Sequence, residues 1–158
     1  MTAHDPDLRP ARGAAAVGQL AELGPVEAGA VLCLRLWSDG PDDRAALQAD
    51  LRQHLGASVG ALACAAMETI GALCTRFGRR PLMRHDVDCA CLGGDEAAFA
   101  LLVATAAEGE TEDALMLAAL IVRADVAPML IAPARDLGLS LRRMSLTIQA
   151  HPAAAMMH

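Results

Sequence analysis

The stretch from Ser58 to Phe77, SVGALACAAMETIGALCTRF, carries the strongest indication of the fold class. Its larger apolar residues recur at spacings of three and four, which is the period of one face of an α-helix. The opposite side of this helix carries mostly small residues, among them Gly60, Ala61 and Ala65. Because small residues allow neighbouring helices to approach closely, we expect other helices to surround this one.

The composition also favours a helical core. Of the 158 residues, 54% are hydrophobic but only 2% are aromatic, with one Trp and no Tyr. Leu, Ala, Val and Met must therefore fill the core, which suits closely packed helices better than a β-sandwich rich in aromatic and β-branched residues. A chain of this length can form one domain without a disulfide or a metal ion.

Turn-forming residues divide the remainder of the chain into further helices. We expect helices over residues 14–23, 26–37, 41–55, 95–108 and 111–123. The uninterrupted apolar run Ala114–Val122 predicts that the last of these is the most buried. A further helix after Asp125 should be kinked or very short, because Pro133 removes a backbone hydrogen bond.

We therefore predict an all-α or mainly α fold, a compact bundle of about five to seven helices around Ser58–Phe77 and Ala114–Val122. Apolar and polar residues alternate in Met83–Cys91 and Leu139–Ile148, so these two segments could pair as one small β element. Residues 14–150 would form the single helical domain. Residues 1–13 would form a flexible N-terminus and residues 151–158 a disordered tail.

Charge and cysteine content limit the expected partners and location. The formal net charge is −6, so we expect no general attraction to nucleic acid or to an anionic membrane. The five cysteines are an odd number and the first twelve residues are polar, which favours free thiols in a reducing cytoplasm. The longest apolar run is shorter than the roughly 20 residues of a membrane span.

One candidate site lies in the segment Met83–Cys91, MRHDVDCAC. In an extended conformation His85, Cys89 and Cys91 point to the same face. An imidazole with two thiols suits zinc or another thiophilic metal, with a fourth ligand drawn from Cys74, His54, Asp86 or Asp88. A redox or regulatory thiol is a second interpretation, and cysteines that merely pack in a half-buried strand are a third. We expect no other cofactor.

A second candidate site is the segment Ala134–Met144, which resembles the helix-turn-helix motif of DNA-binding proteins. The resemblance implies structural roles for Ala134, Gly138 and Ser140, and contacts with DNA for Ser140, Arg142 and Arg143. Pro133 departs from the motif because it falls inside the first helix of the pair. Without the motif, Gly138 would end a helix and a strand-like segment would follow.

The sequence contains no phosphate-binding loop, dinucleotide fingerprint or nucleophile elbow. Gly93 and Gly94, followed by Asp95 and Glu96, predict a turn with a helix cap. We therefore predict a non-catalytic cytoplasmic protein that acts as a protein-interaction or regulatory module, with a second copy or another protein as partner. A helix-turn-helix regulator and a metal or thiol sensor are the alternatives.

Overall fold

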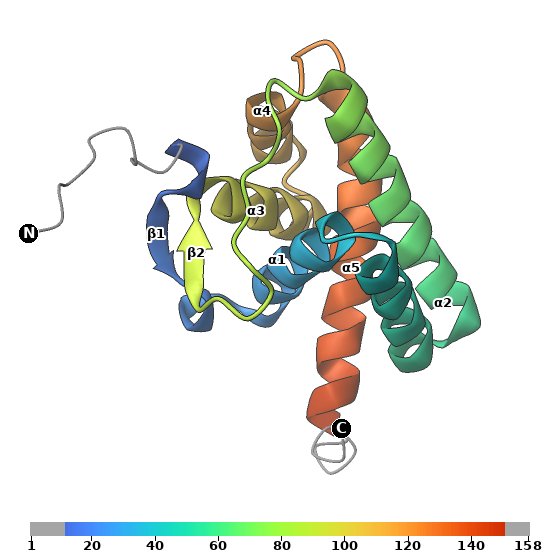
Figure 1. The fold of residues 1–158 in the computed structure, drawn as a ribbon. Coiled ribbons are helices and arrows are strands. Elements are labelled where there is room, and N and C mark those ends of the chain that lie inside the picture. The colour runs from blue at the N-terminus through green and yellow to red at the C-terminus, as the bar shows by residue number, and fades with distance from the viewer. Residues whose placement is uncertain (1–11, 151–158) are drawn as a thin grey trace, which may run out of the picture.

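The computed structural model describes residues 12–150 and is mainly helical, which confirms the predicted fold class (Figure 1). The predictions for residues 1–13 and 151–158 fall outside the described residues, apart from residues 12 and 13. The α-helices are α1 (Pro25–Ser38), α2 (Pro41–Phe77), α3 (Gly94–Glu108), α4 (Thr111–Ile121) and α5 (Pro128–Ala150). The strands are β1 (Ala16–Gln19) and β2 (Cys91–Gly93), and short 3₁₀ helices η1 and η2 cover Arg12–Ala14 and Leu20–Glu22.

Helix α2 consists of two helical segments that join at Gly56. This glycine has φ 82° and ψ 170°, a backbone conformation that interrupts the helix at the predicted position. The two segments pack closely against each other: a Cβ atom placed on Gly60 would lie only 2.6 Å from the Cα of Arg52. The break at Gly56 therefore converts one long helical stretch into a helical hairpin.

The centre of the core is formed by α3 and α5. Helix α5 packs against each of the other four α-helices, and α3 packs against α1, α4 and α5. Phe99, Leu102 and Val103 of α3 are fully or almost fully buried. The helices α3 and α5 approach so closely at Gly138 that a Cβ atom there would lie 2.6 Å from the Val103 carbonyl oxygen.

The prediction that Ser58–Phe77 is enclosed by other helices is wrong. One side of this segment packs into the core through Met67 and Ile70, but the other side faces solvent and Leu62 is 48% exposed. By length and composition α2 is the one described helix that could cross a membrane, because it contains an 18-residue window with a mean hydropathy of 1.6. Core helices of soluble proteins satisfy the same criterion, and 39% of that window is buried inside the molecule.

A small β element is present, but its strands are not the predicted pair. Strand β1 runs antiparallel to β2, with Ala16 opposite Gly93 and Gln19 opposite Cys91. The predicted helix over residues 14–23 is wrong, because β1 and two 3₁₀ helices occupy that stretch. The predicted strand Leu139–Ile148 is part of α5, where residues at helical spacing face the core. The sheet and α2 lie at opposite sides of the molecule in Figure 1.

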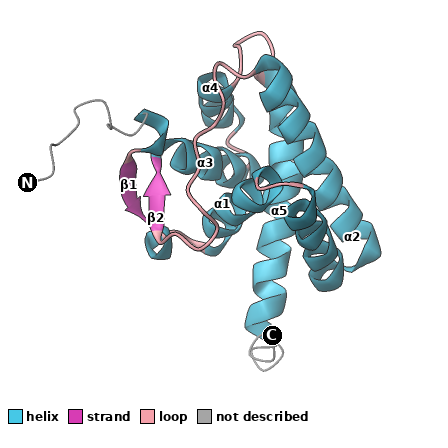
Figure 2. Cartoon of the chain, viewed as in Figure 1, coloured by secondary structure: helices cyan, strands magenta, loops and turns pink. Residues whose placement is uncertain are grey.

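The connection from α2 to β2, residues 78–90, is a long loop that crosses α1 and α3 (Figure 2). An isolated β-bridge between Gly78 and Val122 attaches the start of this loop to the end of α4. Residues 79–90 contain no helix or strand.

Candidate functional site

A buried ion pair between Arg35 of α1 and Glu96 of α3 lies beneath this loop. The Arg35 Nε donates to Glu96 Oε1 at 2.7 Å and its Nη2 donates to Oε2 at 3.1 Å, so the contact is bidentate. Both side chains have 0% of their surface exposed. Charged side chains this deeply buried require full hydrogen bonding, because unpaired charges cannot remain ionised in a low dielectric.

The backbone of the loop supplies the remaining hydrogen bonds. Arg35 donates to the carbonyl oxygens of Cys89 and Cys91, both at 2.7 Å, and more distantly to Val87. Glu96 accepts hydrogen bonds from the backbone N–H groups of His85 and Gly93, both at 2.9 Å. Both members of the ion pair therefore bind the loop backbone, and together they hold the loop against α1 and α3.

The electrostatics agree with a charged pair. Burial raises the pKa of Glu96, but hydrogen bonds from Arg35, Gly93 and His85 outweigh it and leave this pKa below its ordinary value. The hydrogen bond to Glu96 raises the pKa of Arg35, although burial opposes this rise. Glu96 is thus ionised at neutral pH in spite of its position in the core.

The neighbouring carboxylate, Asp95, binds the beginning of the same loop. It accepts hydrogen bonds from both terminal nitrogens of Arg80 and from the backbone N–H of Met83 at 2.7 Å. Gly13 packs directly against this carboxylate and leaves no room for a side chain. The predicted turn with a helix cap is present, since Glu96 accepts the Gly93 N–H, but the two acidic residues also hold the long loop.

The three predicted metal ligands are not gathered at one point. The His85 Nε2 lies 3.1 Å from the carbonyl oxygen of Ala14, whereas the carbonyl oxygens of Cys89 and Cys91 both accept hydrogen bonds from Arg35. Within residues 12–150, no three His, Cys, Asp or Glu side chains are arranged so that they could hold a metal ion. Zinc binding at His85, Cys89 and Cys91 stays a prediction.

The other three cysteines lie in less polar surroundings. Burial raises the pKa of the Cys33 thiol to about 12 and that of Cys74 to about 11. Burial also raises the pKa of Cys64. These thiols remain protonated at neutral pH. Cys33 and Cys64 pack in the core as small apolar groups, whereas Cys74 is half-buried, as Cys89 and Cys91 are.

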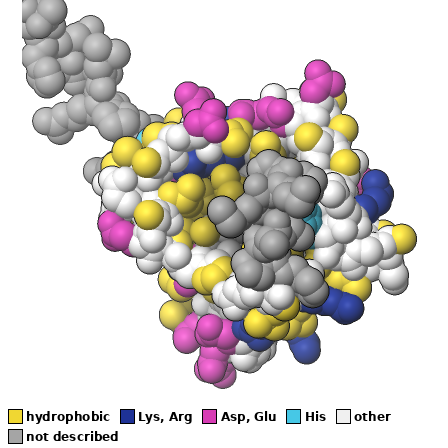
Figure 3. All heavy atoms as spheres, turned by 90° about the horizontal axis from the view of Figure 1, so that it is seen from below, with side chains coloured by type: hydrophobic (Ala, Val, Ile, Leu, Met, Phe, Trp, Pro, Cys, Tyr) yellow, Lys and Arg dark blue, Asp and Glu magenta, His cyan; other side chains and the backbone are white. Residues whose placement is uncertain are grey.

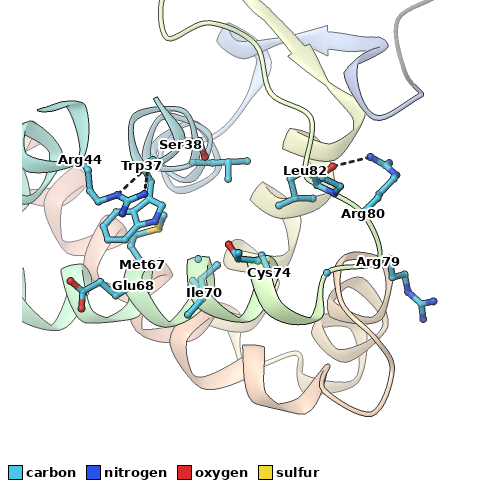
Figure 4. Close-up of a pocket in the computed structure, with 16 residues that line it drawn as sticks. Trp37, Ser38, Arg44, Met67, Glu68, Ile70, Cys74, Arg79, Arg80 and Leu82 are labelled. Atoms are coloured by element: carbon cyan, nitrogen blue, oxygen red, sulfur yellow. Dashed lines mark hydrogen bonds between the residues drawn. The ribbon is translucent and has the colours of Figure 1, made fainter. Parts of the chain in front are cut away.

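A groove of about 920 Å³ lies between α1, the second segment of α2 and residues 78–82 (Figure 4). Its floor is formed by the buried side chains of Leu34, Met67 and Ile70. Trp37 lines one wall of the groove. Arg79 lies at the opposite end, and its side chain points away from the groove. The groove is thus apolar at its base and polar along its rim.

Trp37 provides the most specific chemistry in this groove. Arg44 stacks over its ring at 4.3 Å from the centroid and donates two hydrogen bonds to its carbonyl oxygen. No group in the described part of the chain accepts a hydrogen bond from the indole Nε1, which is not sealed from solvent. Gly71 is required here, because a Cβ atom would lie 2.7 Å from that nitrogen. The groove can therefore receive an apolar group that carries a hydrogen-bond acceptor.

The turn required by the helix-turn-helix interpretation is not formed. Helix α5 continues through Pro133 and Gly138 from Pro128 to Ala150, so of the two expectations for this helix, kinked or very short, the very short helix is wrong. Gly138 serves close packing against α3, and the Ser140 hydroxyl donates to the Asp136 carbonyl at 2.8 Å inside the helix. DNA binding by Ser140, Arg142 and Arg143 stays a prediction.

Arg142 and Arg143 are both exposed on α5. The face seen from below shows hydrophobic, acidic and basic side chains next to one another on the described part of its surface (Figure 3). Leu146, near the end of α5, is 61% exposed. Basic and apolar side chains thus share this end of the molecule.

Helix α4 reverses the predicted pattern of burial. Its fully buried residues are the small Ala114 and Ala118, whereas Met116 is 68% exposed and Leu120 is 67% exposed. The prediction that Ala114–Val122 forms the most buried helix is therefore wrong. Alanines face the core, together with Ile121 at the end of the helix, because α4 lies close to α3, whereas Leu115, Met116 and Leu120 are directed outward.

A second groove, of about 530 Å³, borders this exposed face of α4. Leu115 of α4 and Ile131 and Leu139 of α5 line it, together with Pro128 and Arg135. The exposed apolar surface of α4 therefore continues onto α5.

No protein-family model, curated protein or solved structure matches the chain. The sequence reasoning missed Arg35 and the structural role of Glu96. One signal was available for Arg35, because it follows Val31 by four residues and therefore lies on the same face of the helix.

Proposed function

We propose that this protein acts through its surfaces as a protein-interaction module and that two copies associate through α4. The observation that carries this proposal is the exposure of Met116 and Leu120 on a helix that buries alanines. Large apolar side chains grouped on a surface mark interaction sites in soluble proteins, because exposing them to water is unfavourable. Leu115 and the adjoining groove on α5 extend this apolar area.

Charge favours a second copy of the same chain as the partner. The first turn of α4 carries Glu112 and Asp113, and Arg123, which pairs with Asp125 at 2.8 Å, follows the end of the helix. Arg79 lies at the same end, where its Nε donates to the Ala119 carbonyl oxygen at 2.6 Å. Among the described residues, no acidic side chain forms an ion pair with Arg79.

An antiparallel pair of α4 helices related by a two-fold axis satisfies these charges. The acidic end of each helix would face the basic end of its partner, and the contact would occur twice. Eleven residues make a helix about 16 Å long, so the charges at its two ends are separated by the length of the apolar contact.

The test is the molecular mass in solution at high micromolar concentration, measured by sedimentation or light scattering. We expect a dimer for the natural chain and a monomer for Leu120→Glu. Burying the exposed two-thirds of the Leu120 side chain contributes about 1.3 kcal/mol. Each copy buries one such leucine, so the dimer gains about 2.7 kcal/mol. The loss corresponds to an increase of about 100-fold in the dimer Kd.

Leu62→Glu is the matched control, because Leu62 is also an exposed leucine on a helix. It lies about 22 Å along α2 from Phe77, the residue beside the end of α4. This variant should remain dimeric, and circular dichroism should show that both variants retain their helices. A monomeric natural chain, or equal effects of the two substitutions, would refute the proposal.

Reversal of charge tests the antiparallel arrangement. Glu112→Arg and Arg123→Glu should each weaken association, because each places like charges opposite each other at both ends of the contact. The double variant should recover the affinity. If the double variant is weaker than either single variant, the helices do not pair in this orientation.

A further inference from the structure

Cys89 and Cys91 are presented together on the half-buried side of the loop that precedes β2. The Cys89 N–H donates to the Asp86 carbonyl at 3.0 Å, which closes a turn immediately before the pair. Cys91 begins β2 and lies opposite Gln19 of β1. Both thiols are therefore carried by backbone that is anchored on each side.

The guanidinium group of Arg35 binds the backbone of both cysteines. Two nitrogens of Arg35 donate to the Cys89 and Cys91 carbonyl oxygens, each at 2.7 Å. Since Arg35 is itself held by buried Glu96, the separation of these two residues is set by a rigid polar group in the core.

The side chains of Cys89 and Cys91 lie on one side of the chain. The carbonyl groups of both residues bind Arg35, as expected for an extended backbone, in which side chains two residues apart share a face. Residues two apart in an extended segment have Cα atoms about 6.6 Å apart, close to the upper end of the range that a disulfide spans. A small movement of the loop would bring the sulfur atoms to bonding distance.

We propose that Cys89 and Cys91 are a reversible redox pair that forms a disulfide by exchange with a small-molecule disulfide. The proposal is independent of association through α4. It depends on the two neighbouring thiols, their partial exposure and the common anchoring of their carbonyl groups.

The exchange proceeds in two balanced steps. The Cys89 sulfur, as thiolate, attacks the external disulfide, forms a mixed disulfide and releases one small thiolate. The Cys91 sulfur then attacks the Cys89 sulfur, and its proton passes to the second departing small thiol. One disulfide bond forms in the protein, one is broken in the reagent, and two small thiols are produced.

The interaction with Cys89 and burial raise the pKa of Cys91, while the charge of Arg35 opposes the rise. A thiol whose pKa is raised ionises less readily and is a poorer first nucleophile, which suits Cys91 to the second, resolving step.

Disulfide formation should weaken the contacts of Arg35. Drawing the two residues together reorients the carbonyl groups that now accept its hydrogen bonds. We expect the oxidised protein to unfold at a lower urea concentration than the reduced protein. The disulfide should accordingly be easily reduced, as strained disulfides are.

The test uses the full chain incubated with oxidised glutathione, then unfolded and labelled with N-ethylmaleimide for mass spectrometry. The reduced protein contains five thiols, so the reduced sample should take five labels and the oxidised sample should take three. Peptide mapping should place the disulfide between Cys89 and Cys91, and dithiothreitol should restore all the labels.

Single variants separate this pair from the other cysteines. Cys91→Ser should stop at a stable glutathione adduct on Cys89, whereas Cys74→Ser should form the disulfide as the natural chain does. Absence of reaction, adducts on both cysteines, or a disulfide that includes Cys74 would overturn the proposal.

Urea unfolding tests the link to Arg35. The oxidised natural chain should show a lower midpoint than the reduced chain, and the Cys89→Ser/Cys91→Ser double variant should show the same midpoint with and without oxidant. An unchanged midpoint in the oxidised natural chain would refute the coupling to Arg35.

Discussion

Replacement of Arg35 by Met tests the argument about the buried ion pair most directly. Met replaces the aliphatic part of Arg but lacks the guanidinium group, so it leaves Glu96 without its charged partner in a position that has no solvent exposure. Two backbone N–H groups, those of His85 and Gly93, would still donate to the carboxylate. Removing one member of a buried pair costs about 3–5 kcal/mol, because the remaining charge is uncompensated.

The loss should depend on pH in a defined direction. In the natural chain the folded-state pKa of Glu96 lies below its ordinary value of 4.5, so its stabilisation is present above that pH and is lost as pH falls through the folded pKa. Without Arg35, burial would raise this pKa, and ionised Glu96 would destabilise the fold at neutral pH. The difference between the two proteins should therefore be larger at pH 7 than at pH 4.

Urea unfolding followed by circular dichroism at both pH values measures these free energies. With a slope of about 2 kcal/mol per molar urea, the expected loss lowers the midpoint at pH 7 by about 2 M. Arg84→Met is the matched control, since Arg84 pairs with Asp39 at 2.8 Å but its side chain is 29% exposed. Such a pair contributes up to about 1 kcal/mol. A loss below about 1 kcal/mol for Arg35→Met, or an equal loss at both pH values, would refute the reasoning.

Three further predictions concern close packing and thiol reactivity. Gly60→Ala should lower the free energy of unfolding by about 1–3 kcal/mol, because the added Cβ would lie 2.6 Å from the Arg52 Cα. Gly138→Ala should cause a similar loss, since its Cβ would lie 2.6 Å from a backbone carbonyl of α3. Gly24→Ala is the control: Gly24 has open space around it, so this substitution should change the free energy of unfolding by less than about 1 kcal/mol in the same urea assay. Cys74, whose pKa is raised to about 11 by burial, should react with iodoacetamide at pH 8 at least about 100-fold more slowly than an ordinary exposed thiol; a comparable rate measured by mass spectrometry would contradict this assignment.

Several helix boundaries could be predicted because local residues determine them. Pro25 and Pro41 occupy first turns of helices, and Gly56 and Gly109 have positive φ where helical segments end. Proline and glycine act on the backbone within one or two residues, so their effect does not depend on the rest of the fold. The order of the helical segments from α1 onward followed from such signals.

The burial of α4 could not be predicted from its composition. A run that is apolar on all sides can bury either its alanines or its larger side chains, and the choice depends on which side α3 covers. The same ambiguity affected Leu139–Ile148, whose apolar spacing fits both a strand and a helix. The position of α5 against the other four helices resolved it.

The candidate sites also combine features that are visible in the sequence with contacts that form only in the folded chain. The neighbouring positions of Cys89 and Cys91 are visible in the sequence, as is the placement of Glu96 in a helix cap. Arg35 binds both Glu96 and the backbone carbonyl oxygens of the two cysteines, and it lies 61 residues before Glu96. No local pattern specifies a contact across that separation, because it forms only when α1, α3 and the loop pack together.

The helical character of the chain and several ends of its helices follow from interactions within a few residues, so they can be read from the sequence. Which helix faces are covered, and which charged groups meet in the core, depends on how the helices pack. Burial and ion pairing depend on distances between remote segments, and those distances exist only in the folded chain.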